Sequence, residues 1–326
     1  MVRALLAVSL TESNQVAILD LDEPERERCT ICVSGEQPYG LAFDEALPRV
    51  YATCWNSAKL IAIDFSSSEQ QKSLPAARLP AWATRRQGTT ELWISNEGAG
   101  IVTVFDTAEW KTTCEIATGG GPSDIAFTDN GRHAWVSNEK DATVSLIDAV
   151  ARRKIQDIRV GEVPQGIGLL SNGKGLLVAN FGSNSISIID TGTKEEVKQI
   201  PVGPGPVVVV TLGSGSLEQV WVSCFAGGLV SVVSIERQQQ IQQVTTGGKP
   251  HGLETHPNGE RIYVAVRELN ELAVLSSERP STILRRISMP GGPARMAVAA
   301  ANAYTDIPFR WDEAFAHHSS STHRGE

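Results

Sequence analysis

The sequence is poor in the features that most directly assign a function. It has five cysteines and 6% aromatic residues, and none of its apolar stretches reaches the about 20 residues that a membrane-spanning helix needs. Five cysteines in 326 residues are too few for a disulfide-built domain. Cys29 and Cys32 form a CxxC pair in an expected strand, where residues three apart point to opposite faces, so a joint metal site is not expected there. No histidine follows Cys32, so c-type haem attachment is not expected either.

Catalytic sequence motifs are missing as well. The chain has no GxSxG, no HExxH and no P-loop, and the glycine run 119–121 precedes Pro122, where we expect a loop rather than a phosphate-binding helix start. The net charge of −8 repels nucleic-acid phosphates, so nucleic acid is not an expected partner. A membrane is not expected either, because no apolar stretch is long enough to span one. We assign no catalytic residue, and an enzyme is less expected than a binding protein.

What the sequence does contain is a repeat with two markers. A proline recurs every 42 to 44 residues, at Pro38, Pro80, Pro122, Pro164, Pro206, Pro250 and Pro293. An aspartate, replaced twice by serine, recurs at nearly the same period, at Asp20, Asp64, Asp106, Asp148, Asp190, Ser234 and Ser276. Two markers that share one period, with four short strands in each unit, are typical of a β-propeller.

Each marker has a physical role in its unit. Proline fixes its own φ and biases the preceding residue toward extended backbone, which suits the start of a strand. Small residues follow, as in GLAF (40–43) and GIGL (166–169), and suit an innermost strand that is crowded at the axis. The aspartate that ends the third strand can accept N–H groups of the following turn, and serine can do so more weakly.

The expected fold is all-β, a seven-bladed β-propeller of four-stranded antiparallel blades over residues 1–302. Apolar residues on both faces of the strands fit sheets that pack between neighbouring sheets. Six complete units leave three strands at the N-terminus and one proline-led strand, 293–301, at the C-terminus, so we expect one blade closed by both termini. Residues 303–326 leave the pattern, and we expect a C-terminal tail that is partly disordered.

Two stretches carry a resemblance to a known family. AWVSNEKDATVSLID (134–148) and LLVANFGSNSISIIDTGTKEEVKQIPVG (176–203) resemble the YVTN-type β-propeller repeat. The likeness covers residues 1–302 and is strongest at 120–204, and it departs from the repeat where Cys54, Cys224 and Val266 replace an asparagine. The resemblance implies a seven-bladed propeller but no single activity, since lactonases, haem-handling proteins and binding scaffolds share this architecture.

The candidate site lies at one end of the propeller axis. The loops before the first strands and after the second strands meet on that face and surround an axial mouth. Aromatic side chains, amides and charges of both signs around one concavity predict a small-molecule or peptide site. The candidate ligand-binding residues are Tyr39, Trp55, Trp82, Asn96, Glu97, Asp124, Asn138, Gln165, Asn180, His251, Arg267 and Arg295.

Several of these residues also have a structural explanation. Asn96, Asn138 and Asn180 occupy equivalent positions, where an asparagine can hold its own loop by side-chain hydrogen bonds. His251 follows Pro250 at the expected mouth, where it either acts as an acid, base or ligand or simply lines the channel.

Three functions are compatible with this sequence. The preferred one is a non-catalytic scaffold that binds a protein partner or a small ligand at the mouth. The first alternative is a metal-dependent hydrolase of the lactonase type, which requires mouth carboxylates such as Glu139 and Glu268 to converge. The second is a propeller that handles haem or another cofactor, with His251 as a ligand. The sequence identifies no cofactor and no resident metal.

We expect a monomer in the cytoplasm. The first ten residues combine an arginine with a short apolar run, but they match the repeat better than a signal peptide, whose removal would delete part of a blade. A periplasmic or exported location is the alternative if further residues precede residue 1.

Overall fold

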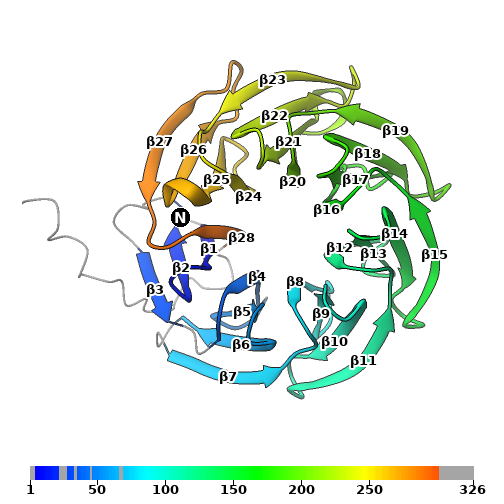
Figure 1. Cartoon of the computed structure of the whole chain (residues 1–326), viewed down its shortest axis with the longest axis vertical. Coiled ribbons are helices and arrows are strands. Elements are labelled where there is room, and N and C mark those ends of the chain that lie inside the picture. Colours follow the sequence, from blue (N-terminus) through cyan, green and yellow to red (C-terminus); the bar gives the residue numbers. More distant parts are fainter. Residues whose placement is uncertain (1–3, 22–27, 33–34, 45, 66–68, 301–326) are drawn as a thin grey trace, which may run out of the picture.

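The strands form seven four-stranded antiparallel sheets that stand as blades around one axis (Figure 1). The computed structural model describes residues 4–21, 28–32, 35–44, 46–65 and 69–300, so the expected tail, 303–326, lies outside the described residues. The seven-bladed fold expected from the repeat is confirmed.

We name the blades A to G, and in each the strand nearest the axis comes first. Blade A contains β28 (Pro293–Ala300), β1 (Ala4–Leu10), β2 (Gln15–Asp20) and β3 (Arg28–Cys32). Blade B contains β4 (Pro38–Phe43), β5 (Arg49–Cys54), β6 (Lys59–Asp64) and β7 (Glu69–Pro75). Blade C contains β8 (Pro80–Arg85), β9 (Glu91–Asn96), β10 (Ile101–Asp106) and β11 (Lys111–Ala117). Blade D contains β12 (Pro122–Thr128), β13 (His133–Asn138), β14 (Thr143–Asp148) and β15 (Arg153–Arg159).

The remaining blades follow the same order. Blade E contains β16 (Pro164–Leu169), β17 (Gly175–Asn180), β18 (Ser185–Asp190) and β19 (Glu195–Pro201). Blade F contains β20 (Pro206–Leu212), β21 (Gln219–Cys224), β22 (Leu229–Ser234) and β23 (Gln239–Thr245). Blade G contains β24 (Pro250–Thr255), β25 (Arg261–Val266), β26 (Glu271–Ser276) and β27 (Ile283–Ser288). Two short 3-10 helices occupy turns, η1 (Gly215–Leu217) in blade F and η2 (Arg267–Leu269) in blade G.

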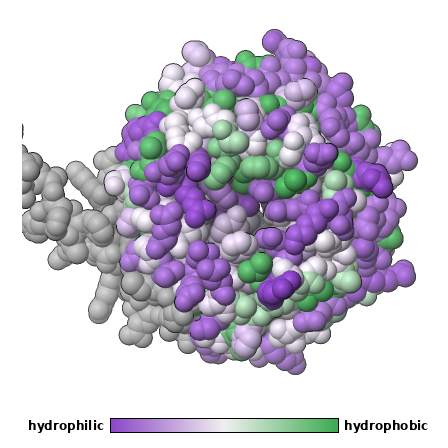
Figure 2. Space-filling view, viewed as in Figure 1, coloured by the Kyte–Doolittle hydropathy of each residue, from purple (hydrophilic) through white to green (hydrophobic). Residues whose placement is uncertain are grey.

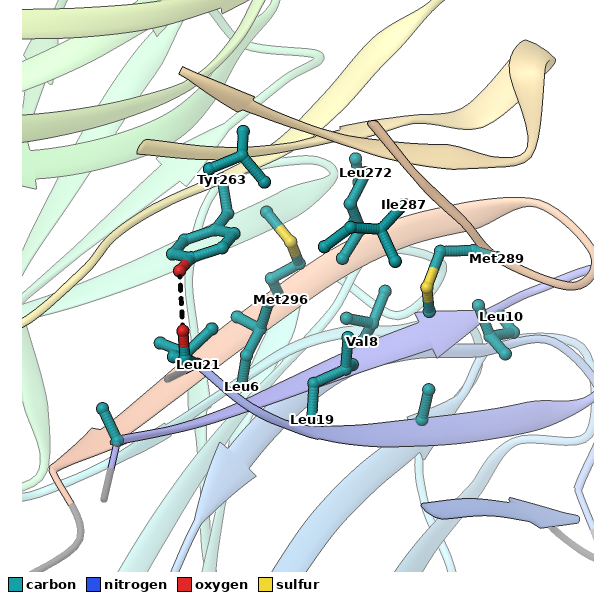
Figure 3. Close-up of a cluster of buried hydrophobic side chains, with 14 residues drawn as sticks. Leu6, Val8, Leu10, Leu19, Leu21, Tyr263, Leu272, Ile287, Met289 and Met296 are labelled. Carbon is teal, nitrogen blue, oxygen red and sulfur yellow. Dashed lines mark hydrogen bonds between the residues drawn. The ribbon is translucent and has the colours of Figure 1, made fainter. Parts of the chain in front are cut away.

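Both ends of the described chain build blade A, as expected. β28 pairs antiparallel with β1, and Met296 lies opposite Val8. Both side chains are buried in an apolar cluster against blade G, where Tyr263 donates a hydrogen bond to the carbonyl of Leu21 (3.3 Å; Figure 3). The ring is therefore closed by strand pairing within one blade and by packing against the next.

Apolar side chains fill the spaces between blades. Trp93 of blade C packs in one cluster with Ile125 of blade D, and Trp135 of blade D packs in another with Ile167 of blade E. Both faces of the middle strands are thus covered, which is why these strands lack an alternating polar face.

The turn role of the closing aspartates is confirmed. Asp106, Asp148 and Asp190 each accept two backbone N–H groups with one carboxylate oxygen, at 2.8–3.0 Å. These bonds hold the pKa of the three carboxyls below the ordinary value. Ser234 and Ser276 each accept one such N–H, at 3.2 and 3.1 Å.

In six of the seven blades, the residue before the marker proline differs from the expectation of extended backbone. Gln37, Leu79 and Val163 have φ values of 55°, 52° and 50°, and glycine fills this position in blades D, F and A with φ of 64–68°. The carbonyl explains the difference, because in this conformation that of Gln37 accepts the N–H of Trp55 and that of Leu79 accepts the N–H of Glu97 (3.0 and 2.9 Å). Tertiary hydrogen bonding thus overrides the local bias that proline imposes.

A β-bulge lies between the inner and second strands of every blade. In blade D, Pro122 pairs with Asn138 and Ile125 pairs with Val136, so one extra residue is accommodated between the two pairs. A bulge changes the direction in which side chains leave a strand. In blades B to G it falls on the residues just after the marker proline, which are those expected at the mouth.

Hydroxyl groups join neighbouring blades beside these bulges. The hydroxyl of Ser137 accepts the N–H of Asp124 in its own blade (3.0 Å) and donates to the carbonyl of Gln165 in blade E. The same pair of contacts is made by Thr53, Ser95 and Ser223. These hydroxyls fix the spacing of the inner strands around the axis.

Candidate functional site

A cavity of about 260 Å³ lies at the mouth. Blades A, B, C, D and G line it through residues that precede an inner strand, begin it, or follow a second strand. They are Thr11, Gln37, Tyr39, Trp55, Ala81, Glu97, Ser123, Glu139 and Arg267. Hydrophilic residues gather around the centre of the ring on the face shown in Figure 2.

Backbone hydrogen bonds hold the turns that carry the charged side chains. The N–H groups of Glu97, Glu139 and Arg267 each donate to the carbonyl of the residue before the proline of the same blade, at 2.9, 2.9 and 3.0 Å. Because the same bond recurs in these blades, the side chains leave the backbone at equivalent places around the axis.

One wall of the cavity is aromatic. The rings of Tyr39 and Trp55 stack with centroids 6.3 Å apart and an interplanar angle of 27°. The hydroxyl of Tyr39 is hydrogen-bonded to Nε2 of His251 at 3.2 Å. Nε1 of Trp55 is buried without a hydrogen-bond acceptor among the described residues.

His251 packs against the Tyr39 side of this wall. It is 6% exposed and packs edge-on against Tyr39 and against Phe225, with both centroid distances 5.7 Å. Burial, followed by the charges of Arg295 and Arg267, holds its pKa well below the ordinary value. The imidazole is therefore neutral near pH 7.

Arg295, on β28 of blade A, contacts aromatic rings of blades B and C. Its guanidinium carbon lies 4.7 Å from the ring centre of Trp82 and 5.2 Å from that of Tyr39, in cation–π contact with both. The residue is 1% exposed, and its Nε and Nη1 are buried without a hydrogen-bond acceptor in the part of the chain that the structure describes. A buried donor without an acceptor costs about 1–3 kcal/mol.

Two further carboxyl groups lie on inner strands, the buried Asp124 on β12 and the half-buried Glu254 on β24. Asp124 accepts the N–H groups of Ile125 and Ile167 at 2.6 and 2.8 Å, which ties blade D to blade E. Burial raises the pKa of Asp124 to about 6, against the effects of those bonds and of Arg295. Burial and then the charge of Asp124 raise the pKa of Glu254 to about 8, so Glu254 carries a proton at neutral pH.

The acidic side of the mouth consists of Glu97 and Glu139. Burial and then the charge of Glu97 raise the pKa of Glu139 to about 7, although a hydrogen bond from Ser123 opposes the shift. On blade G, Nε of Arg267 lies 3.5 Å from a carboxylate oxygen of Glu12. The mouth thus has carboxylates on blades C and D and a guanidinium on blade G.

A second cavity, of about 450 Å³, is lined by Trp82, Glu254 and Met296, with Asp44 and Arg85 paired at 3.7 Å. Tyr39 lines the mouth cavity and Trp82 lines the second one, and Arg295 packs on both rings. The side chain of Arg295 therefore lies between the two cavities.

The structure brings part of the predicted site together. The predicted residues that line the mouth cavity are Tyr39, Trp55, Glu97 and Arg267. Four more predicted residues lie behind this lining. His251 contacts Tyr39, Arg295 packs on Tyr39 and Trp82, and the charge of Arg295 acts on Asp124.

The other predicted residues do not line it. Asn96, Asn138 and Asn180 are buried and donate to hydroxyl groups of the third strand in their own blades, at 2.8–3.1 Å. Gln165 accepts the blade-linking bond from Ser137. These four residues hold the scaffold around the mouth.

The list of ligand-binding candidates omitted five lining residues, namely Thr11, Gln37, Ala81, Ser123 and Glu139, of which Glu139 was considered only as a mouth carboxylate of the hydrolase alternative. A positional rule would have found them, because each precedes or begins an inner strand or follows a second strand. Residue chemistry favoured aromatic and charged side chains and therefore passed over Thr11, Gln37, Ala81 and Ser123.

Among the described residues, no three His, Cys, Asp or Glu side chains come close enough together to hold a metal ion. The helices described are also too short and polar to cross a membrane.

Comparisons with known proteins agree with this fold. A family model described as a YNCE-like β-propeller matches residues 6–217, which supports the β-propeller family but not the YVTN repeat by name. No curated protein matches the chain in sequence.

Solved structures with this architecture are distant in sequence. Hydrazine synthase of Kuenenia stuttgartiensis is 15% identical, with a TM-score of 0.71 over 82% of this chain and 96% of that one. A putative 6-phosphogluconolactonase of Bacteroides fragilis is 14% identical, with a TM-score of 0.76 over 91% and 98%. Dihydro-heme d1 dehydrogenase NirN is 13% identical, with a TM-score of 0.65 over 90% and 74%. At this identity the likeness shows the fold alone.

Proposed function

The chain belongs to the YNCE-like β-propeller family, and from this fold and its mouth cavity we propose that it is a non-catalytic protein that binds a small ligand there. The cavity is partly enclosed, has an aromatic wall and gathers polar groups from five blades, as ligand sites commonly do. A concave site of this size favours a small ligand over the flat surface of a protein partner.

The observation that carries this proposal is the set of unpaired donors beside the cavity. Nε and Nη1 of Arg295 and Nε1 of Trp55 are buried and have no acceptor among the described residues. Native proteins leave few buried donors unpaired, because each one destabilises the fold. A ligand or water oxygen at this place would supply the missing acceptor.

The test is a thermal-shift screen of small metabolites, followed by titration calorimetry on the compounds that stabilise the protein. Trp55→Phe keeps an aromatic ring but removes Nε1–H, and Arg267→Gln removes a charge from the lining. We expect each to weaken binding by about tenfold, the effect of about 1.4 kcal/mol. Arg237→Gln, in an exposed turn of blade F, is the matched control and should bind as the unaltered protein does. Equal affinity in all the variants would reject the mouth as the site.

One contact favours a hydrolase as a second candidate. The hydroxyl of Ser123 is bonded to Glu139, whose pKa of about 7 suits a general base acting on a serine hydroxyl. The metal-dependent form of this candidate lacks a converging donor set among the described residues. Turnover of lactones or esters that Ser123→Ala abolishes would support hydrolysis and reject the non-catalytic proposal.

The cofactor-handling alternative rests on His251. Because Nε2 already contacts Tyr39 and the ring is 6% exposed, binding haem iron would require this wall to move. A coloured protein whose absorption is lost in His251→Ala would support it. A monomeric state and a cytoplasmic location remain proposals, and light scattering of the purified protein tests the first.

A further inference from the structure

The chemical groups that lack a partner at the mouth differ from one side to the other. Glu97 and Glu139 lie on the adjacent blades C and D, and no described residue gives Glu97 an ion pair or a side-chain hydrogen bond. Nε1 of Trp55 and the buried nitrogens of Arg295 belong to blades B and A. On the acidic side, Glu97 has no cation in contact, and the charges of Arg295 and Lys140 offset the raised pKa of Glu139 only in part. The aromatic side lacks a hydrogen-bond acceptor.

Arg295 is suited to hold a carboxylate. Its guanidinium is fixed between Tyr39 and Trp82, so its N–H groups keep one direction, and a planar guanidinium binds a carboxylate through parallel hydrogen bonds. The residue is 1% exposed and therefore cannot turn out to solvent to find its acceptor.

The pair of glutamates is suited to hold an ammonium group. Two carboxylates close enough to raise the pKa of one of them repel each other when both are ionised. A cation between them removes this repulsion, and an ammonium group can donate to both.

We propose that the ligand is a small zwitterion of the amino-acid type, with its ammonium group at Glu97 and Glu139 and its carboxylate at Arg295 and Nε1 of Trp55. This inference rests on the proposed binding function of the same cavity. The volume of about 260 Å³ is below that of most drug-sized sites, which suits a ligand of amino-acid size.

The experiment is titration calorimetry of the full chain with the standard L-amino acids at pH 8. Each compound that binds is then compared with its methyl ester, which lacks the carboxylate, and with its N-acetyl derivative, which lacks the ammonium group. We expect at least one amino acid to bind and each derivative to bind at least tenfold more weakly.

Variants assign the two charges to their residues. Glu139→Gln should weaken binding of the amino acid about tenfold and leave the already weaker binding of its N-acetyl derivative unchanged. Arg295→Lys keeps the charge but loses the planar donors. It should weaken binding of the amino acid and leave the already weaker binding of the methyl ester unchanged. Glu115→Gln, on the exposed outer strand β11, is the control for charge and should change nothing. Affinity should also fall severalfold at pH 6, where Glu139 takes up a proton.

The outcomes separate this inference from the proposed function. If an ester or an N-acetyl derivative binds as tightly as its parent, or if only non-zwitterionic compounds bind in a Trp55-dependent way, the zwitterion is rejected and the binding function stands. If no small molecule binds at the mouth, both proposals fall. Circular dichroism of Arg295→Lys shows whether that variant keeps its fold, and Glu139→Gln tests the inference independently of it.

Discussion

At the scale of single residues, the channel is surrounded by acidic groups that are partly or fully buried. Glu139, Asp124 and Glu254 all have pKa values raised mainly by burial, to about 7, 6 and 8. Arg295 is the buried cation whose charge offsets part of this effect on Asp124 and Glu139. The protonation of the mouth therefore changes across the physiological pH range.

Glu139→Gln should stabilise the fold at pH 8 and have little effect near pH 4.5. The folded pKa of about 7 exceeds the ordinary value of 4.5, so the folded state binds this proton more tightly. The resulting stability is fully present below about pH 4.5 and is lost as pH rises through 7. We expect a gain of about 1 kcal/mol at pH 8, less than the ~1.4 kcal/mol per pKa unit would give, because water reaches this half-buried carboxyl.

Urea unfolding of both proteins at pH 4.5, 6 and 8 measures this difference. Glu115→Gln, which is exposed on β11, should shift the free energy of unfolding equally at all three values. The raised pKa would be contradicted if Glu139→Gln behaved in the same way.

The sequence predicted which positions reach the mouth better than it predicted which residues work together. Tyr39, Trp55, Glu97 and Arg267 follow from strand order alone, since each lies beside the end of a strand at the axis. The cation–π contacts of Arg295 join three blades, and no spacing in the chain encodes them.

At the scale of elements, hydroxyl groups connect the inner strands around the mouth. Ser137→Ala should destabilise the protein by about 1–3 kcal/mol, because the N–H of Asp124 at the bulge loses its buried acceptor. Blades E and G carry Ala179 and Ala265 at the equivalent position, so the alanine side chain itself is tolerated there. Urea unfolding measures the loss.

Ser171→Ala is the control for this substitution. Ser171 is exposed in the turn between β16 and β17, and its removal should change the free energy of unfolding by less than about 0.5 kcal/mol. Equal effects of the two substitutions would show that the hydroxyl of Ser137 does not join the blades.

Packing at the blade A–G contact gives a second prediction at this scale. Met296→Ala should cost about 2–4 kcal/mol, because Met296 is 2% exposed in the cluster shown in Figure 3 and its removal leaves a cavity. Leu284→Ala, on β27 of the neighbouring blade, removes a side chain that is 55% exposed and should cost less than about 1 kcal/mol. Chemical unfolding of the two variants tests whether the contact between blades A and G stabilises the fold.

The order of the elements was predictable, whereas their local geometry was not. The recurring proline and aspartate gave the strand boundaries, since each acts through its own backbone or side chain. The bulges and the left-handed φ of Leu79 and Val163 depend on hydrogen bonds to another strand of the same blade, so the local sequence indicated the opposite conformation.

At the scale of the whole molecule, the ring depends on one seam between distant parts of the chain, the pairing of β1 with β28. Residues near positions 7 and 297 share blade A, although about 290 residues separate them in sequence. The other six blades are each formed by one continuous stretch of chain. Loss of the β1–β28 pairing would therefore open the ring and remove Arg295 from the channel together with β28.

A disulfide across this seam should form and should stabilise the ring. Ala7 lies opposite Ala297 and Leu6 lies opposite Val298, and adjacent pairs in an antiparallel ladder alternate between two spacings. One of the double variants Ala7→Cys/Ala297→Cys and Leu6→Cys/Val298→Cys should therefore crosslink readily on mild oxidation. Closing so long a loop restricts the unfolded chain by on the order of 5 kcal/mol as an upper bound, so oxidation should raise the melting temperature and reduction should reverse the gain. Each single cysteine variant is the control for crosslinking to one of the five existing cysteines. If neither pair formed an intramolecular crosslink, the shared blade would not exist in solution, and the mouth cavity built on it would not exist either.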